Sequence, residues 1–381
     1  MNKPWHPFET AASLDPIERP SRSIVFLGSS HDNGGSSVLA ENLAAAMRHH
    51  GHRVEEWYLF GSAAGYDTVT HVFDPGPRSA RSLPQLIPRV TKALHNASPD
   101  AVFGLQALAN VVIGFSGRLV GIPQRIATLH NPRDQQNRAL MALDGLLGRH
   151  GFYSAVVACS QTIADGFVIN GASYMSRLTV IPNGHGRPAT MAKDAARREL
   201  GLPPAGLVVG QLGRLCWQKN QTFSLRLLQN MPEATLLLVG IGPDEPQLKA
   251  EIETLGLSER VVRIPSLPHQ HVGLFYSAID AALFPSRFEG LSLAAIETIH
   301  SQVPLLCADI PSFREMFATS PGLARALLLP DDVAVWAAQL RRIVRNPTRA
   351  IIADDLALLS PRFAFDTMAQ QYLRLLDRGR V

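Results

Sequence analysis

The sequence is poor in cysteine, with only Cys159, Cys216 and Cys307 among its 381 residues. An odd and widely spaced set of three provides neither a disulfide framework nor the paired spacing of a metal site. Each cysteine lies in a mostly apolar stretch, so we expect three buried thiols that serve as small hydrophobic side chains. This usage favours a protein of a reducing compartment.

Long apolar runs and dense basic runs are also lacking. No window reaches about 18 uninterrupted apolar residues, so no membrane span is expected. Residues 1–20 show no apolar core of a signal peptide. We therefore expect a cytoplasmic protein, with peripheral contact at the inner face of the membrane as an alternative. The formal net charge is only +4, and Lys and Arg do not cluster, so no nucleic-acid partner is expected.

What is present is the composition of an ordered globular protein, with 46% hydrophobic and 18% charged residues. The length exceeds the size at which a single core usually stops growing, which predicts two domains. Short apolar strands alternate with helical stretches along the chain. This order predicts an α/β fold with two parallel sheets that helices cover on both faces. Ligands of such sheets bind at the carboxyl ends of the strands.

The predicted elements fall into two series. The first has strands at 23–28, 54–60, 101–104, 125–128, 154–158 and 178–181 and helices at 36–50, 83–95, 133–149 and 161–169. The second has strands at 208–212, 235–239, 261–264, 281–284 and 303–307 and helices at 221–229, 246–255, 292–300 and 333–344. The polar stretch 185–193 between them suits an interdomain linker. An amphipathic stretch at 365–376 predicts a last helix that docks on another element.

Two candidate positions lie in the first series. Gly34 and Gly35 stand between a strand and a helix, where a backbone without side chains approaches a phosphate closely. Their order is not that of a dinucleotide fingerprint, and an ordinary tight turn is the alternative. His130 follows the strand at 125–128, which would place it at a carboxyl end. A surface or capping histidine is the alternative reading.

A pair of cations follows the first strand of the second series. Arg214 and Lys219 lie five residues apart in a loop that opens onto a helix, where they could grip a diphosphate. A solvated pair of surface charges is the alternative. Trp217 lies between them, either as a stacking platform for a ligand or as a packed aromatic.

The stretch 284–297 holds two carboxylates at a defined spacing. Glu289 is expected in a loop after a strand, and Glu297 within the following helix. Gly290 to Ser292 would begin that helix and offer backbone N–H groups to a phosphate. Carboxylates accept pairs of hydroxyl hydrogen bonds, which suits a sugar and a ribose. The alternative is a helix with an acidic start and one exposed glutamate.

The seven residues between Glu289 and Glu297 form an E-x7-E pattern, which resembles that of family 4 glycosyltransferases with the GT-B fold. Other segments resemble that family's landmarks, in its order: Gly34-Gly35, 157–160, 180–184, Gly213-Arg214 with Lys219-Asn220, and 240–243. The resemblance extends from about Ser23 to Leu376.

The resemblance implies two facing Rossmann-like domains, the first (1–182) for the acceptor and the second (183–360) for the donor, with residues 361–381 crossing back to the first. It implies a hexosyltransferase that moves a sugar from a UDP- or GDP-sugar to a glycan or polyprenol-linked acceptor, with retention, in surface polysaccharide or glycoconjugate biosynthesis. No further cofactor and no metal are expected.

The resemblance also implies a role for each candidate residue. Arg214 and Lys219 would bind the donor diphosphate, Glu289 and His130 the donor sugar, and Glu297 the ribose. The remaining donor contacts would come from Gly34, Gly35, Gly213, Gly290, Leu291 and Ser292. A sugar-nucleotide epimerase or phosphorylase on the same frame, or a scaffold that binds nucleotide sugars without turnover, are the alternatives.

Overall fold

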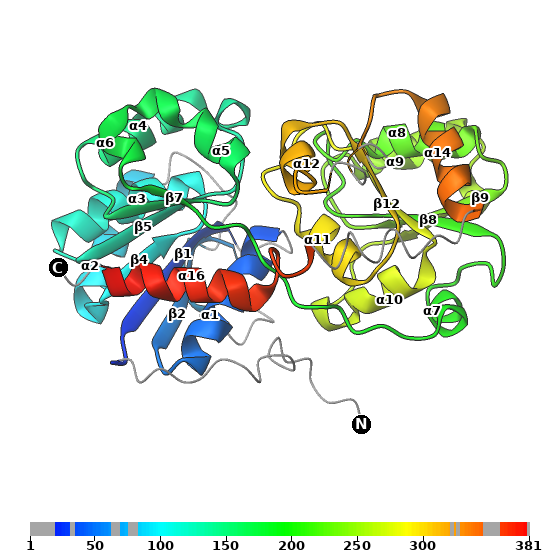
Figure 1. Cartoon of the computed structure of the whole chain (residues 1–381). Helices are drawn as coiled ribbons and strands as arrows, with labels where there is room; N and C mark the ends of the chain where they lie inside the picture. Colours follow the sequence, from blue (N-terminus) through cyan, green and yellow to red (C-terminus); the bar gives the residue numbers. More distant parts are fainter. Residues whose placement is uncertain are drawn as a thin grey trace. The chain divides into compact units, whose positions relative to one another are not determined.

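The computed structural model describes residues 20–30, 35–61, 69–74, 83–320, 324, 328–345 and 359–378. The chain divides into two compact units, each with its own parallel sheet (Figure 1). Of the described residues, those within 20–183 and 366–378 belong to the N-terminal unit, and those within 184–365 belong to the C-terminal unit. The predicted α/β fold with two parallel sheets is confirmed.

The described strands of the N-terminal unit form a seven-stranded sheet in the order β3-β2-β1-β4-β5-β6-β7. Their bounds are β1 Ser23–Ser30, β2 Arg53–Phe60, β3 Val69–Asp74, β4 Ala101–Gly104, β5 Gln124–Leu129, β6 Ala155–Ala158 and β7 Leu178–Val180. Every pairing between neighbours is parallel. The strand order reverses between β1 and β4, which is the topological switch point of this sheet.

Helices cover both faces of this sheet because alternate strand residues point to opposite sides. Their bounds are α1 Gly35–His49, α2 Leu83–Ala97, α3 Ala107–Leu119, α4 Arg138–Arg149, α5 Gln161–Gly166, α6 Ala172–Met175 and α16 Phe365–Arg378. Val25 and Leu27 belong to the buried cluster that includes α2 and α3. On the other face, Phe26 stacks on Phe103, which in turn contacts Tyr372 of α16.

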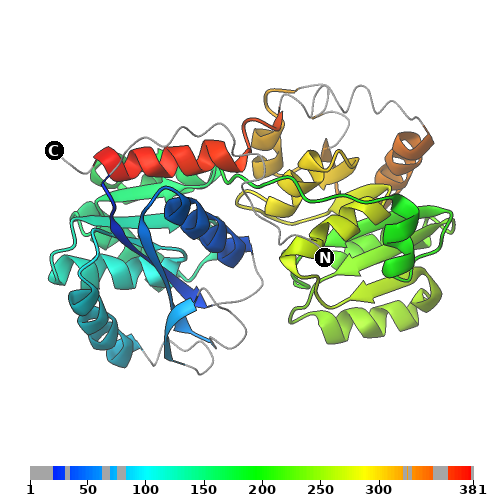
Figure 2. The ribbon, with the colours of Figure 1, turned by 90° about the horizontal axis from the view of Figure 1, so that it is seen from below.

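The last helix is held on the N-terminal unit by hydrogen bonds at its carboxyl end. The carbonyl oxygen of Leu376 accepts from Arg22 Nη1 at 2.7 Å and from Gln124 Nε2 at 2.6 Å. In Figure 2, α16 runs along one face of the N-terminal sheet. The prediction of a terminal helix that docks on another element is therefore confirmed.

The described strands of the C-terminal unit form a six-stranded sheet in the order β10-β9-β8-β11-β12-β13, again parallel throughout. The strands are β8 Leu207–Leu212, β9 Ala234–Val239, β10 Val261–Ile264, β11 Ala281–Phe284, β12 Leu305–Ala308 and β13 Leu328–Leu329. The helices are α7 Lys193–Glu199, α8 Gln221–Gln229, α9 Glu245–Thr254, α10 Val272–Ala278, α11 Leu293–His300, α12 Pro311–Met316 and α14 Val333–Arg345. The order reverses between β8 and β11, so the loops that follow these two strands flank the switch point.

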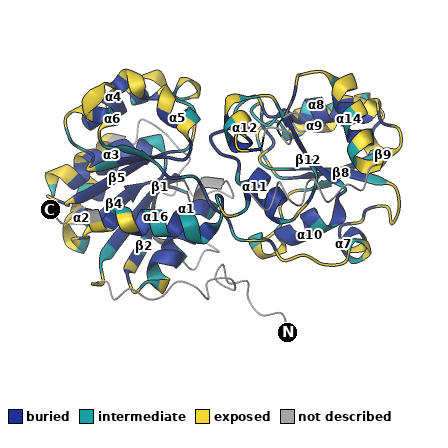
Figure 3. Ribbon diagram, in the orientation of Figure 1, coloured by how far each residue is buried: buried dark blue, intermediate teal, exposed yellow. Residues whose placement is uncertain are grey.

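Buried strands and helices with one exposed face appear in both units (Figure 3). The three cysteines are buried and free, as the sequence predicted. Within the described part of the chain, no helix has both the length and the apolar character that crossing a membrane requires.

Two predicted helices are each divided in the structure. The helix predicted over 161–169 ends as α5 at Gly166 and is followed by a 3₁₀ helix, η3 (Val168–Asn170). The helix predicted over 133–149 is divided into a short 3₁₀ helix, η2 (Arg133–Gln135), and α4. The break occurs because the side chain of Asn137 caps α4 by accepting from the N–H of Leu140 at 3.1 Å. The stretch 185–193, predicted as an interdomain linker, directly follows the boundary between the two units at Gly184. His185 is buried and its N–H donates to the carbonyl of Phe363, whereas Arg187 and residues 189–192 are exposed.

Candidate functional site

The site in the C-terminal unit is built on the loop that follows β8. Gly213 leaves the strand with φ of 145°, and Gly240 leaves the neighbouring β9 with φ of 147°. A Cβ at Gly240 would lie 2.0 Å from the carbonyl oxygen of Gly213, so only glycine allows the two loops to approach this closely. The N–H of Leu215 then donates to the carbonyl of Ile241 at 2.9 Å. The position of the 213–216 segment is thereby fixed by backbone contacts.

The loop continues to Lys219, which lies directly before α8. The carbonyl of Lys219 accepts from Gln211 Nε2 at 2.7 Å, and Gln211 Oε1 accepts from the Ser224 hydroxyl at 2.7 Å. Asn220 follows with φ of 55°, in the left-handed region that asparagine tolerates better than most residues. Gln211 on β8 thus fixes the backbone of Lys219, and Ser224 on α8 holds the Gln211 side chain in place.

The loop after β11 is tied to the same segment. Asn220 Nδ2 donates to the carbonyl of Pro285 at 3.1 Å, and its Oδ1 accepts from Arg287 at 3.1 Å. The N–H of Arg287 donates to the carbonyl of Gln218 at 2.8 Å. The two loops that flank the switch point therefore form one hydrogen-bonded structure.

Lys219 and Glu289 meet where these loops join. Lys219 Nζ lies 2.6 Å from Glu289 Oε1, with side-chain exposures of 18% and 6%. Arg214 is exposed, and its carbonyl accepts from Gln221 Nε2 at 2.9 Å. Trp217 is 60% exposed. The Cζ atom of Arg287 lies 5.1 Å from the centroid of the indole ring, so the guanidinium partly covers one face of the indole. The structure thus brings one predicted cation and one predicted carboxylate into direct contact.

The segment after Glu289 leads into α11. Gly290, Leu291 and Ser292 are buried, and Ser292 is the N-cap, with its Oγ accepting from the N–H of Ala295 at 3.4 Å. The helix begins at Leu293, one residue later than the sequence predicted. Backbone N–H groups at this N-terminus are suited to an anion.

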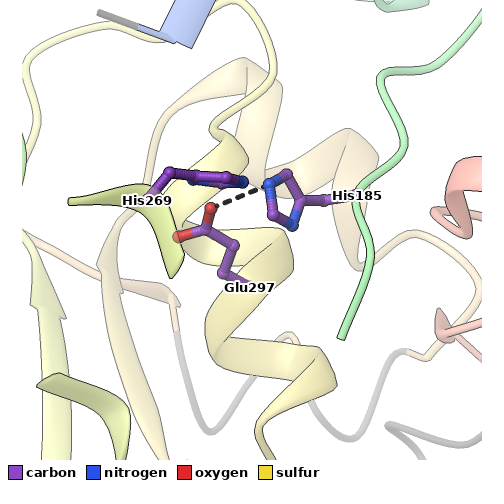
Figure 4. Close-up of side chains that lie close together, drawn as sticks. All are labelled: His185, His269 and Glu297. Carbon is purple, nitrogen blue, oxygen red and sulfur yellow. Dashed lines mark ion pairs between the residues drawn. The ribbon is translucent and has the colours of Figure 1, made fainter. Parts of the chain in front are cut away.

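Glu297 lies in different surroundings from Glu289. It is buried, so the alternative of an exposed glutamate is wrong. Its Oε2 accepts from the Tyr276 hydroxyl at 2.6 Å, and its Oε1 lies 3.1 Å from His185 Nε2. His269, in the short 3₁₀ helix η5 (His269–His271), packs edge-on against His185. Figure 4 shows the two rings and the carboxylate facing one another.

Burial shifts the pKa values of Glu297 and His185 in opposite directions. It raises the pKa of Glu297 and lowers that of His185 to about 4, because a charge loses its hydration inside the protein. His185 Nδ1 lies 2.8 Å from the carbonyl oxygen of Gly186 and therefore carries a hydrogen. Burial therefore disfavours the charged form of both groups, whose Oε1 and Nε2 atoms lie 3.1 Å apart.

The candidates of the N-terminal unit lie at the ends of its strands. His130 follows β5, and its Nε2 lies 2.9 Å from Thr128 Oγ1. Desolvation lowers the pKa of His130 to about 4, which keeps the ring neutral at physiological pH. Gly35 is the first residue of α1, whereas Gly34 lies outside the described residues.

Sequence reasoning missed the residues that position these groups. Gln211 lies on β8, Tyr276 on α10 and His185 in the predicted linker, each on a different element from the residue that it positions. No local pattern distinguishes them from core or surface residues, and only the sheet topology brings them to the site.

Both halves of the chain match models of known protein families. Residues 33–185 match the family described as Glycosyltransferase Family 4, and residues 192–355 match Glycosyl transferases group 1. The fold resembles that of HepE from Anabaena, crystallised with UDP-glucose, at a TM-score of 0.81 and 21% identity over 94% of this chain and 100% of that one. Each half of the chain thus matches a glycosyltransferase family, and the fold is that of the GT-B glycosyltransferases.

Two curated relatives illustrate the range of this class. The lipopolysaccharide core biosynthesis mannosyltransferase LpsB of Rhizobium meliloti is 27% identical over 47% of this chain and 53% of its own. The 2-deoxystreptamine glucosyltransferase of Streptomyces kanamyceticus is 24% identical over 61% of this chain and 64% of its own. The matched regions thus span about half to two thirds of the length of these relatives.

Proposed function

We propose that this protein transfers a hexose-type sugar from a UDP- or GDP-sugar to a glycan or lipid-linked acceptor, with retention of configuration, in polysaccharide or glycoconjugate biosynthesis. The observation that carries the proposal is the pair of Lys219 and Glu289, placed by the two loops that flank the switch point of the C-terminal sheet. This is where open parallel sheets bind nucleotides. The UDP-glucose complex of HepE supports the donor class.

The proposed chemistry follows from the charges of this region. Cleavage of the bond between sugar and phosphate places negative charge on the leaving diphosphate. Lys219 and the exposed Arg214 would stabilise that charge, together with the backbone amides of Gly290 and Leu291 at the start of α11. Preorganised donors of this kind contribute about 10²- to 10³-fold each to turnover.

The two carboxylates have separate proposed roles. Glu289 uses Oε1 for Lys219, and its second oxygen would accept a hydroxyl group of the donor sugar. Glu297 is proposed to hold the ribose, and both of its oxygens already have partners inside the unit. Ribose binding at Glu297 therefore requires the contact with His185 to open. The role of His130 stays a prediction.

A panel of nucleotide sugars tests the proposal. The full-length protein is mixed separately with UDP-glucose, UDP-N-acetylglucosamine, GDP-mannose and ADP-glucose, and the melting temperature is recorded. We expect one donor to raise it, since a ligand that binds only the folded state stabilises that state by mass action. Lys219→Met should abolish this shift, whereas Arg341→Met, which removes an exposed cation paired with Glu233, should retain it.

Incubation of the stabilising donor with and without acceptors distinguishes the rival functions. Transfer or slow hydrolysis with release of the nucleoside diphosphate is expected. A new sugar nucleotide formed without any acceptor would identify an epimerase instead. Binding without turnover across a broad acceptor screen would identify a scaffold, and no binding of any donor would refute the proposal.

A further inference from the structure

Two histidines and a glutamate converge in the C-terminal unit, apart from the Lys219–Glu289 pair. His185 stands at the beginning of the unit, His269 precedes α10, and Glu297 lies on α11. One potential ligand atom from each lies within 4.8 Å of the other two (Figure 4). Residues from three distant parts of the chain thus direct nitrogen and oxygen atoms to one point.

The groups around this cluster orient it. His185 Nδ1 donates to the carbonyl of Gly186 at 2.8 Å, which turns Nε2 toward Glu297. The Tyr276 hydroxyl donates to Glu297 Oε2 at 2.6 Å, which leaves Oε1 on the side of the histidines. An imidazole that donates its other N–H to a carbonyl, beside a carboxylate that accepts a hydrogen bond, is the outer shell typical of metal ligands.

We propose that His185, His269 and Glu297 form a binding site for a divalent transition-metal ion, with zinc as the best match. Two imidazoles and one carboxylate are a recurrent zinc ligand set that leaves a fourth position for water. Imidazole nitrogens also suit copper and nickel, whereas magnesium and calcium prefer oxygen ligands.

The dimensions of the cluster fit such an ion after a small adjustment. Zinc bonds of 2.0–2.1 Å separate tetrahedral ligands by about 3.4 Å. His185 Nε2 and Glu297 Oε1 are already 3.1 Å apart, so the third ligand, His269, has to move inward. His269 is only partly buried, and a small cavity lined by both histidines and by Gly273 lies beside it.

A bound ion would tie three elements together. His185 is attached through its backbone N–H to Phe363, near the end of the unit, at 3.0 Å. The ion would link this segment to η5 and to α11, and occupancy should raise the melting temperature of the folded protein. No step of the proposed transfer uses the ion, but Glu297 is also the proposed ribose ligand, so zinc and the donor would compete for this carboxylate. The zinc test is therefore made without any nucleotide.

Titration of the full-length protein with Zn²⁺ alone, after EDTA treatment and dialysis, tests the site. We expect one tight equivalent by isothermal titration calorimetry and by metal analysis after gel filtration. His185→Gln and His269→Gln should each weaken it at least about tenfold, because loss of even an outer-shell partner costs 10- to 100-fold. His95→Gln, which changes an exposed histidine of the N-terminal unit, should leave it unchanged.

A second variant and a second metal cover the case in which His185→Gln does not fold. If His185→Gln fails to fold, His269→Gln decides, because its ring is partly exposed and its loss should be tolerated. Co²⁺ in place of Zn²⁺ should give the visible absorption of a four-coordinate site in the wild type and lose it in His269→Gln. Absence of a tight equivalent in the wild type, or its persistence in His269→Gln, would overturn the proposal.

Discussion

Removal of the Lys219 ammonium should destabilise the protein through the carboxylate that it leaves behind. Glu289 is 6% exposed and its Oε1 lies 2.6 Å from Lys219 Nζ, so Lys219→Met leaves a buried charge without its cation. Breaking a buried ion pair by removal of one partner costs about 3–5 kcal/mol. Because the lysine side chain retains 18% exposure, we expect a loss of about 3 kcal/mol, at the lower limit of that range.

A double-mutant cycle isolates the pair. Glu289→Gln keeps an oxygen acceptor for the ammonium but loses the charge, and should cost about 1–2 kcal/mol. The double variant should cost about 2 kcal/mol less than the sum of the two single changes, a typical coupling for residues in direct contact. The free energies come from urea denaturation of the four proteins, followed by far-ultraviolet circular dichroism.

An exposed ion pair of the same length is the matched control. Arg314 Nε lies 2.6 Å from Asp309 Oδ1, but the two side chains are 62% and 39% exposed. Arg314→Met should therefore leave the urea midpoint unchanged, since water screens exposed pairs. If Lys219→Met proved no more harmful than Arg314→Met, burial would not control the energy of the Lys219 pair, and the reasoning would be refuted.

Three further changes test other parts of the structure. Gly240→Ala should cost about 3 kcal/mol and weaken donor binding, because its Cβ would lie 2.0 Å from the carbonyl oxygen of Gly213; an unchanged urea midpoint would contradict this. Tyr276→Phe should cost about 1–3 kcal/mol by removing the hydrogen bond to buried Glu297, again measured by urea denaturation. The neutral form of His130 should stabilise the protein fully above pH 6.5 and lose that contribution as the pH falls toward 4, so His130→Gln should flatten the pH dependence of the melting temperature in that window.

The sequence predicted buried central strands well because apolar runs between turn residues have few alternatives. The strands at 101–104, 261–264 and 281–284 have the predicted bounds. The edge strand β3, with the sequence VTHVFD, was missed, since polar and apolar residues mix where only part of the strand is covered. The helix α3, mostly buried, was not identified because its apolar character is nearly uniform and shows no single face.

The proximity of Lys219 and Glu289 was predicted, whereas their roles in binding a ligand stay predictions. Lys219 and Glu289 were expected to approach one ligand, and the structure shows that they also contact each other. That contact depends on Asn220 and Gln211, whose hydrogen bonds join segments about 65 and 8 residues apart along the chain. Such bonds have no local signature, so composition and spacing do not reveal them.

The spacing of the two glutamates explains why their surroundings differ. From Glu289 the chain passes through a buried loop to the cap at Ser292, and only then enters α11. Each residue of the helix turns by about 100°, so Glu297 emerges toward α10 and His185 rather than toward Lys219. One motif thus supplies a carboxylate to each of two distinct polar clusters. Glu289→Gln should therefore change the response to nucleotide sugars and leave zinc binding intact, whereas Glu297→Gln should abolish zinc binding even where no nucleotide is present. Equal loss of zinc binding in both variants would show that the two clusters act as one.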